Sequence, residues 1–412
     1  MRKALFAGLM TTALAGSAAA QAPLFPTPRS ESATYAGYDT PTKVSGDTIE
    51  ELTAERILMA PKFWVAGEYQ ILWAQNANVP QIIERIPAQF ASGGGNSFPA
   101  NVRVNEFPTR RDIRYDSINA YRVSAGVRIQ PQLALDGNYF TTETANERAT
   151  VSGSGLPGTD GISRSYTQAG TGNQISLFAA QPGQYSGSVT AHSNMQAWGV
   201  DSNLRWDTYH IFVDRTELLA GFRYFNLGER ISIDDSSTFS DGRRLTVSDN
   251  FQSRNHFYGG QVGFHSRIYG TVWSLDFINK YAIGGVNQEV RAFGSNSIIS
   301  PAGVEDREQG GLYARGANVG TFSRNRFAVA AESSTIVGYN LTPNVRLHFG
   351  YHGSWISSVI RAPEVIDPVV NDSNVRYISL PSPSNANRPA FQWNRASDYF
   401  LQGISFGVTA GY

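Results

Sequence analysis

The sequence predicts an all-β protein, a transmembrane antiparallel β-barrel of about ten strands. Ten segments alternate apolar and polar residues, which is the period of a strand whose two faces meet different surroundings. The gaps between these segments are alternately long, from 23 to 52 residues, and short, from two to eight residues. Membrane barrels show the same rhythm, because tight turns lie on one side of the membrane and long loops on the other.

The expected strands are defined by their alternation and by the turn-rich gaps around them. They are Phe63–Trp73, Ser117–Ile129, Gln132–Thr142, Met195–Trp206, Arg215–Ile231, Asn255–Tyr269, Val272–Ile283, Phe327–Asn340, Val345–Ile360 and Tyr399–Tyr412. The gaps 143–194 and 284–326 are each long enough to contain a further hairpin, and a hairpin in one of them would raise the count to twelve. The loops 74–116, 143–194 and 284–326 are rich in Gly, Ser, Asn and Thr and show no obvious hydrophobic core.

The last segment shows the alternation most clearly. Ile404, Phe406 and Val408 share one face, whereas Ser405 and Thr409 share the other. A soluble β-sandwich would show the same alternation with its apolar face turned inward. Alternation alone therefore leaves the two folds open.

The positions of the tryptophans favour the membrane barrel. Trp64, Trp206 and Trp273 lie near the short turns, and Trp73 and Trp355 lie near the long loops. Aromatic girdles mark the two membrane interfaces of such barrels. We therefore expect these five side chains to face the lipid at the two edges of the membrane.

The N-terminus reads as a secretory signal peptide. Met1-Arg2-Lys3 is followed by an apolar run to Ala15 and by a small-residue cleavage site after Ala20. We expect a signal peptide at 1–20, a periplasmic leader at 21–61 and an outer-membrane barrel at 62–412. After the signal no apolar run is long enough for a membrane-spanning helix.

Composition excludes several classes of function. The chain has no cysteine, so disulfides, thiolate metal sites and thiol nucleophiles are ruled out. Its 34 basic and 34 acidic residues cancel, which argues against a nucleic-acid partner. Its 40 glycines suit crowded, curved β-structure.

Several segments form a recognisable set of motifs. They are Phe63–Tyr69, Ala220–Leu227, Asn255–Gly263, Gly310–Ala314, Asn318–Gly320, Phe327–Val329 with Glu332, Gly338–Thr342 and Arg388–Phe391. Together they resemble one known family, the planctomycete outer-membrane β-barrel proteins of the beta-barrel protein seven type. The sequence departs from the family after Arg361, where Ala362-Pro363 stands in place of Pro-Gly. The resemblance implies an outer-membrane barrel and no catalytic or ligand residues.

The polar faces of the strands give the expected lumen. Its lining residues are Glu68, Arg122, Arg128, Asp136, Asp201, Arg205, Glu217, Arg223, Arg267, Asp276, Lys280, Glu332, Arg346 and His348. Acids and bases nearly balance, and a barrel of about ten strands is only slightly wider than one whose side chains fill it. We therefore expect a largely filled lumen braced by salt bridges, with a structural role or a narrow, selective passage.

Two other classes of function stay open. The long loops could bind a surface partner, and an outer-membrane hydrolase could use His256 with Asp235, Asp241 and Asp249. His348 and His352 are about 13 Å apart along an extended strand, too far for one metal ion. The Gly153–Gly158 match to a dinucleotide motif lies in a loop, and the spacing of Asp234, Asp235 and Asp241 is wrong for a calcium loop.

The sequence gives no reason to expect a cofactor, a catalytic residue or a metal. The expected partners are the lipid bilayer and the barrel-assembly machinery, which would read the C-terminal strand ending in Tyr412. No nucleic-acid partner is expected, and the oligomeric state is undetermined.

Overall fold

The structure is a computed structural model that describes residues 61–412, apart from residues 94, 209–213, 379–383 and 385. The expected signal peptide and nearly all of the expected leader lie outside the described residues. No helix within the described part of the chain is long and apolar enough to cross a membrane.

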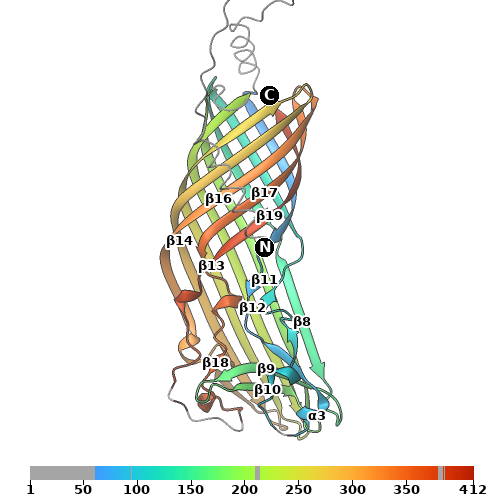
Figure 1. The fold of residues 1–412 in the computed structure, drawn as a ribbon. Helices are drawn as coiled ribbons and strands as arrows, with labels where there is room; N and C mark the ends of the chain where they lie inside the picture. The colour runs from blue at the N-terminus through green and yellow to red at the C-terminus, as the bar shows by residue number, and fades with distance from the viewer. Residues whose placement is uncertain (1–60, 94, 209–213, 379–383, 385) are drawn as a thin grey trace, which may run out of the picture. The chain divides into compact units, whose positions relative to one another are not determined.

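The barrel is a closed ring of antiparallel strands (Figure 1). One sheet holds twelve strands, of which β8 and β15 lie outside the ring, and the pairing of β11 with β12 closes the circle of the remaining ten. In chain order the ring strands are β1 (Phe63–Ala74), β6 (Ile118–Gln130), β7 (Leu133–Thr142), β11 (Tyr185–Asp207), β12 (Arg215–Phe239), β13 (Arg244–Tyr269), β14 (Trp273–Ile299), β16 (Gly320–Thr342), β17 (Val345–Val359) and β19 (Ser397–Gly411). The predicted ten-stranded antiparallel barrel is thus confirmed.

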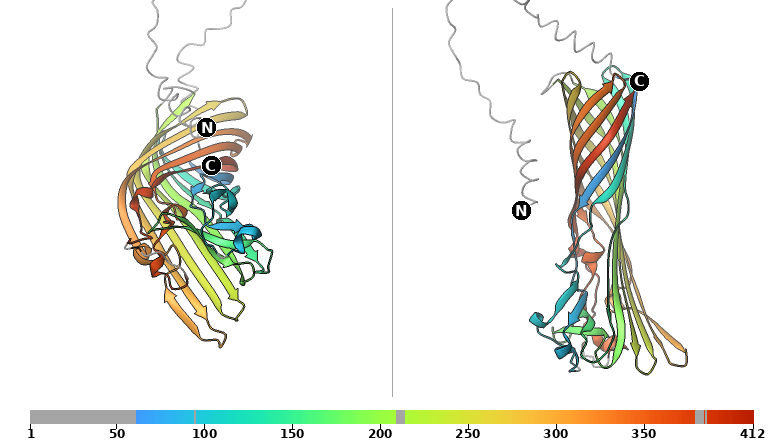
Figure 2. Two further views of the ribbon diagram at one scale, coloured as in Figure 1. Left: turned by 60° about the horizontal axis from the view of Figure 1, so that its bottom comes forward. Right: turned by 90° about the vertical axis from the view of Figure 1, so that its right-hand side faces the viewer.

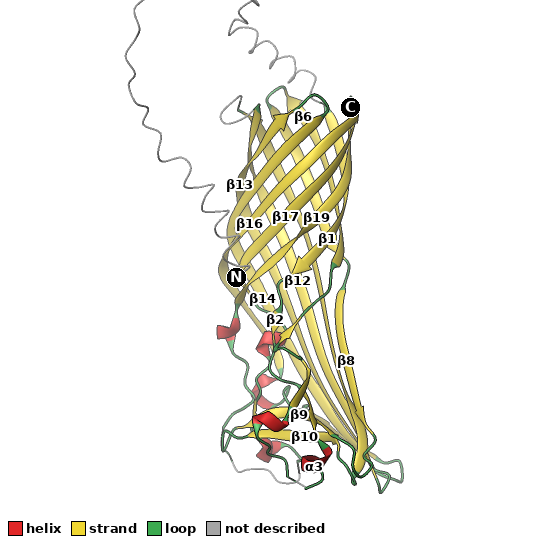
Figure 3. Cartoon of the chain, turned by 45° about the vertical axis from the view of Figure 1, so that its right-hand side comes forward, coloured by secondary structure: helices red, strands yellow, loops and turns green. Residues whose placement is uncertain are grey.

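The remaining elements lie in the long connections (Figure 3). The strands are β2 (Ala77–Asn78), β3 (Ile83–Ile86), β4 (Val104–Phe107), β5 (Asp112–Ile113), β8 (Ala145–Gly153), β9 (Gly161–Gln168), β10 (Gln174–Ala180), β15 (Glu305–Gln309) and β18 (Val369–Val370). The helical turns are α3 (Ala88–Ala91), η1 (Ala100–Val102), η2 (Gly316–Asn318), η3 (Pro363–Val365), η4 (Asp372–Asn374) and η5 (Trp393–Arg395). We call the end with these connections the loop end, and the end with turns 131–132, 270–272 and 343–344 the turn end.

Four neighbouring ring strands are much longer than expected. The expected strands Met195–Trp206, Arg215–Ile231 and Asn255–Tyr269 lie within β11, β12 and β13, which have 23, 25 and 26 residues. The expected strand Val272–Ile283 overlaps β14, which begins at Trp273 and has 27 residues. They project past the rest of the ring (Figure 2). The predicted long loop 232–254 is therefore wrong, because β12 and β13 stay paired up to a turn at 240–243. Its Ser- and Asp-rich composition reads as a loop, but backbone pairing tolerates such residues when only one face is buried.

The long connections contain a hydrophobic core, contrary to expectation. Ile82, Ile162, Leu312 and Tyr313 are each fully buried there. They belong to one apolar cluster that continues into the ring. The gaps 143–194 and 284–326 do contain further strands, β8 to β10 and β15, but these lie outside the ring, so the ring count stays at ten.

The wall of the ring has an apolar outer face. Trp73, Trp206 and Trp273 are exposed on this face, and Trp355 is half-buried on the same side of its strand as exposed Tyr351. Apolar side chains exposed around a closed barrel are typical of a surface that meets lipid.

The prediction for Trp64 is wrong, because its side chain points into the lumen. Trp64 lies on the same face of β1 as Glu68, and the guanidinium of Arg205 lies over its ring at 5.5 Å. Gly126 on β6 is directly opposite, and a Cβ there would overlap the indole. Residues four apart on a regular strand share a face, so Trp64 and Glu68 could not have faced lipid and lumen respectively.

Candidate functional site

The lumen at the turn end contains a cavity of about 510 Å³, which we call the vestibule. Pro61, Gly270, Thr271, Pro343 and Asn344 line its mouth, so it opens at the turn end. Of the fourteen residues expected in the lumen, twelve line the vestibule and the other two, Asp201 and Arg223, line a smaller pocket that adjoins it. The structure thus brings all fourteen together.

Strand register places opposite charges side by side on the inner wall. Glu68 is paired with Arg122 between β1 and β6, and Asp201 is paired with Arg223 between β11 and β12. Arg267 with Asp276 and Lys280 with Glu332 repeat the arrangement. Directly opposed residues have Cβ atoms about 5 Å apart, so such pairs favour this register.

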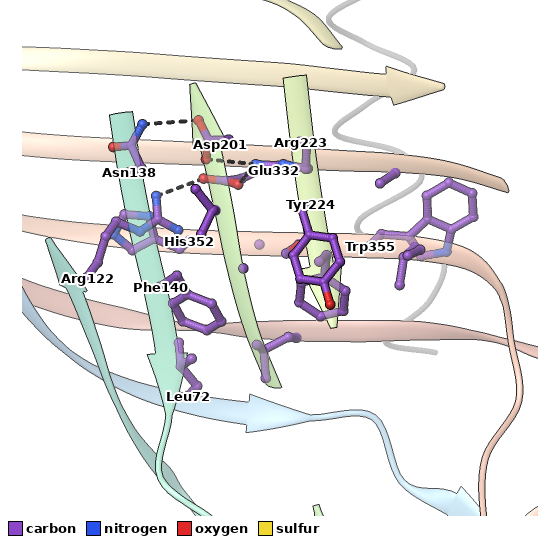
Figure 4. A pocket seen from close by; sticks show the side chains of 18 of the residues that line it. Leu72, Arg122, Asn138, Phe140, Asp201, Arg223, Tyr224, Glu332, His352 and Trp355 are labelled. Carbon is purple, nitrogen blue, oxygen red and sulfur yellow. Dashed lines mark hydrogen bonds and ion pairs between the residues drawn. The ribbon is translucent and has the colours of Figure 1, made fainter. Parts of the chain in front are cut away.

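Ion pairs also cross the lumen from wall to wall (Figure 4). Arg122 on β6 donates to Glu332 on β16 at 2.8 Å, although these strands are four positions apart in the ring. Lys280 on β14 reaches Asp201 on β11 at 3.0 Å, and Arg223 contacts Glu332. These contacts span the lumen at the inner end of the vestibule.

Near the mouth, two carboxylates, Asp276 and Glu217, each contact several cations. Asp276 contacts Arg267 and Arg346, and its Oδ1 lies 2.6 Å from His265 Nε2. Glu217 accepts from Arg205 Nε at 2.9 Å and from Arg215 at 2.8 Å. The mouth is therefore rich in cations whose negative partners are shared.

An apolar layer follows the charged one toward the loop end. Leu72, Phe140, Phe225 and Leu401 form the apolar part of the lining of the smaller pocket, which has a volume of only about 60 Å³. Fully buried Phe257 belongs to the same core. A space of this size leaves room for about one or two water molecules.

A buried ion pair next to this layer joins the segment after β17 to β12. Arg361 and Glu229 are both fully buried, and Arg361 Nε donates to Glu229 at 2.8 Å. Arg361 also donates to the carbonyl oxygens of Gln75 and Asn76 at 3.1 and 3.3 Å. The backbone N–H of Ala362 donates to Glu229 Oε2 at 3.2 Å. Proline at 362, as in the family pattern, could not make this last bond.

A second buried cluster at the loop end holds β9 and residues 312–314 against β13. Asp249 on β13 accepts backbone N–H groups from Leu312, Tyr313 and Ala314 at 3.1, 3.0 and 2.6 Å. It also accepts from Arg164 on β9 at 2.5 Å, and Arg164 donates to Asp235 at 3.2 Å. Burial raises the pKa of Asp235 to about 6, although the Arg164 guanidinium lowers it.

Sequence reasoning missed several of these residues. Arg215 and His265 lie on the inner faces of predicted strands, and the alternation could have identified them. Arg164 lies in an expected loop, Glu229 lies near the end of an expected strand, and Arg361 directly follows one. No local pattern marks those three, because their partners are 71 to 132 residues away in the chain.

The hydrolase cluster that the sequence left open is not assembled among the described residues. His256 lies on the outer face of β13, where its Nδ1 is 2.8 Å from the Tyr224 hydroxyl. Asp235 and Asp249 instead contact Arg164 at the loop end, and Asp241 pairs with Arg243 at the exposed hairpin tip at 2.6 Å. Within the described ranges no group of three His, Cys, Asp or Glu residues could hold a metal ion.

His348 and His352 both lie against one acid. Their Nε2 atoms are 3.4 and 3.6 Å from the two oxygens of Glu68. Both line the vestibule.

The chain belongs to the family described as "Putative beta barrel porin-7 (BBP7)", whose model matches residues 64–412. The expected family resemblance is thus confirmed, while a planctomycete origin stays a prediction. Together with the closed ring, membership implies a barrel of the outer membrane. Comparison with curated protein sequences found no match.

Among solved structures the chain is distantly similar to other outer-membrane barrels. The outer-membrane protease OmpT from Escherichia coli is 9% identical, with a TM-score of 0.36, over 85% of this chain and 96% of that one. The Pseudomonas putida toluene transporter TodX is 6% identical, with a TM-score of 0.23, over 89% and 93%. The monoaromatic hydrocarbon channel CymD is 9% identical, with a TM-score of 0.21, over 90% and 93%. None of these likenesses carries an argument about activity.

Proposed function

We propose that this protein is a closed outer-membrane barrel with a structural role or a narrow, selective passage, and that it is neither an open pore nor an enzyme. The observation that carries the proposal is the lumen itself. Ion pairs from Arg122 to Glu332 and from Lys280 to Asp201 cross it, and the apolar layer around Leu72 lies behind them. An open porin needs a continuous water-filled channel.

Conductance in planar bilayers tests the closure. We expect the purified full chain to insert without the large, steady current of an open pore, while a general porin inserted in parallel supplies the positive control. Large, steady single-channel steps from the folded protein would overturn the proposal.

We also propose an orientation, with the turn end in the periplasm and the loop end outside. Barrels of even strand number place short turns and both termini on the periplasmic side. The chain would reach the membrane through its signal peptide and the assembly machinery would read the last strand. Substituting Tyr412→Ser should then lower the yield of folded protein in the outer-membrane fraction, and an unchanged yield would count against this role of the terminal aromatic residue.

Surface binding is the second candidate, and the folded loop end supports it. Its connections pack around a hydrophobic core and present a defined surface. The turn 240–243 at the tip of β12 and β13 can be altered with little effect on that core. If shortening this turn abolished a measured adhesion while the barrel still assembled, surface binding would be favoured. Unchanged adhesion would remove this tip from the candidate surface.

A further inference from the structure

We infer that the vestibule is a binding site for a small anionic solute that carries a carboxylate or a phosphate. Its volume of about 510 Å³ falls in the usual range for small-molecule pockets, about 300 to 1,000 Å³. Because the mouth lies at the turn end and the inner end is closed, solute would enter and leave on one side. The site goes beyond the proposed function, since binding does not require passage.

Charge on the vestibule wall gives the class of solute. The lining cations are Arg122, Arg128, Arg205, Arg215, Arg267, Lys280 and Arg346, and the lining carboxylates are Glu68, Asp136, Glu217, Asp276 and Glu332. Three residues next to this lining, Asp201, Asp207 and Arg223, also form ion pairs with it or with each other. With these included, eight cations face seven carboxylates, so the positive charge remains in excess.

The excess positive charge lies near the mouth, at Arg128. Its guanidinium donates to the Pro131 carbonyl oxygen at 2.7 Å, and its closest carboxylate contact in the described part of the chain is Glu217 Oε1 at 4.0 Å. Glu217 is already held by Arg205 and Arg215 at hydrogen-bonding distance. Arg128 is therefore a cation whose charge a bound anion could satisfy.

Arg346 adds a second cation that shares its carboxylate. It contacts Asp276, which also contacts Arg267 and His265. An anion beside Arg128 would reduce the repulsion between its guanidinium and those of Arg205 and Arg215, which surround the same carboxylate of Glu217. Charge-assisted bonds from arginine to carboxylate or phosphate are about twice as strong as neutral ones, whereas a neutral or cationic solute gains nothing comparable.

Titration calorimetry on the purified full chain in detergent tests this site. The probes are succinate and inorganic phosphate at low ionic strength, with glucose and putrescine as neutral and cationic controls. We expect one saturable site for at least one anion, which Arg128→Gln weakens about tenfold, equivalent to the loss of about 1.4 kcal/mol. The matched control Arg244→Gln, an exposed arginine at the loop end of β13, should leave binding unchanged.

Three results would overturn the inference. They are no binding of either anion, equal binding of glucose or putrescine, or an equal loss in both arginine variants. Heat-modifiable migration on gels checks that each variant is folded. If Arg128→Gln does not fold, the wild-type protein still decides, because binding in the vestibule must weaken with added salt and salt-independent binding would contradict it. Conductance measures passage and calorimetry measures binding, so the two proposals fail separately.

Discussion

The two halves of the lumen are filled by different kinds of side chain. At the turn end, charged side chains line a cavity that water can enter. At the loop end, apolar side chains pack around two fully buried ion pairs, Arg361 with Glu229 and Arg164 with Asp249. The same kind of interaction therefore operates in wet surroundings in one half and in dry surroundings in the other.

The two halves should therefore respond differently to substitutions. Removing one partner of a dry ion pair leaves a buried charge without compensation, which costs about 3 to 5 kcal/mol. In a cavity that holds water, solvent takes over part of the missing partner's role. The loop end should therefore be the more sensitive half for stability, and the turn end the more sensitive half for ligands.

The largest effect is expected at Asp249. Asp249→Ala removes the acceptor of three backbone N–H groups and leaves Arg164 with Asp235 alone. We expect the free energy of unfolding to fall by about 4 kcal/mol and the 310–319 connection to become sensitive to protease. Urea unfolding in detergent and limited proteolysis measure these effects.

Asp241→Asn is the matched control for that substitution. Asp241 pairs with Arg243 at an exposed turn, so the change should stay within about 0.5 kcal/mol. Similar losses in both variants would show that the loop end is not fastened by the buried cluster.

A leucine in each half gives the second comparison. Leu72 is buried in the apolar layer, whereas Leu219 is buried in the vestibule wall. We expect Leu72→Ala to cost about 3 kcal/mol, since the space left behind stays empty. Leu219→Ala should cost about 1 to 2 kcal/mol, because its space joins a cavity that water can fill. Urea unfolding of both variants measures the difference, and equal losses would contradict the contrast between dry and wet halves.

The next prediction concerns the pH dependence of stability that Asp235, a buried residue of the loop end, should cause. Burial holds the pKa of Asp235 at about 6, above the value of about 4 expected in the unfolded chain. Between these values the folded protein binds the extra proton, so this group's contribution to stability is present below about pH 4 and is lost as pH rises through 6. The loss is about 2 to 3 kcal/mol.

The comparison of wild type with Asp235→Asn isolates this effect. The amide does not titrate in this range, so the variant should lack this part of the decline between pH 4 and 6. Urea unfolding at intervals across the window measures it. Parallel pH profiles for the two proteins would show that Asp235 titrates normally.

The smallest expected effect is a difference in fluorescence quenching, which reports where each tryptophan side chain lies. In variants that retain a single tryptophan, brominated lipids should quench Trp206 and Trp273, which are exposed on the outer face. Trp64, which lines the vestibule, should be quenched little by lipid and more by iodide added to the solution. Strong lipid quenching of Trp64 would place its indole in the membrane and reopen the girdle prediction.

Much of the barrel could be predicted because its rules are local. A strand alternates faces with a period of two, so the sequence by itself determined the ten ring strands and the inward residues such as Arg122, Asp276 and Glu332. The prediction for Trp64 is wrong because a tryptophan near a short turn suggests the girdle, whereas Trp64 shares its face with the inward Glu68. The extensions of β11 to β14 were not predicted, because Ser, Thr and Asp residues in paired strands resemble loop residues.

Which charges meet across the lumen depends on the tertiary structure. Arg122 with Glu332, and Arg361 with Glu229, join residues more than a hundred positions apart, and their distance across the barrel depends on the closure of the whole ring. The hydrophobic core of the loop end likewise gathers Ile82, Ile162 and Leu312 from three separate connections. Alternation along one strand reports its own two faces and carries no information about which distant strand lies opposite, so the partners had to come from the fold.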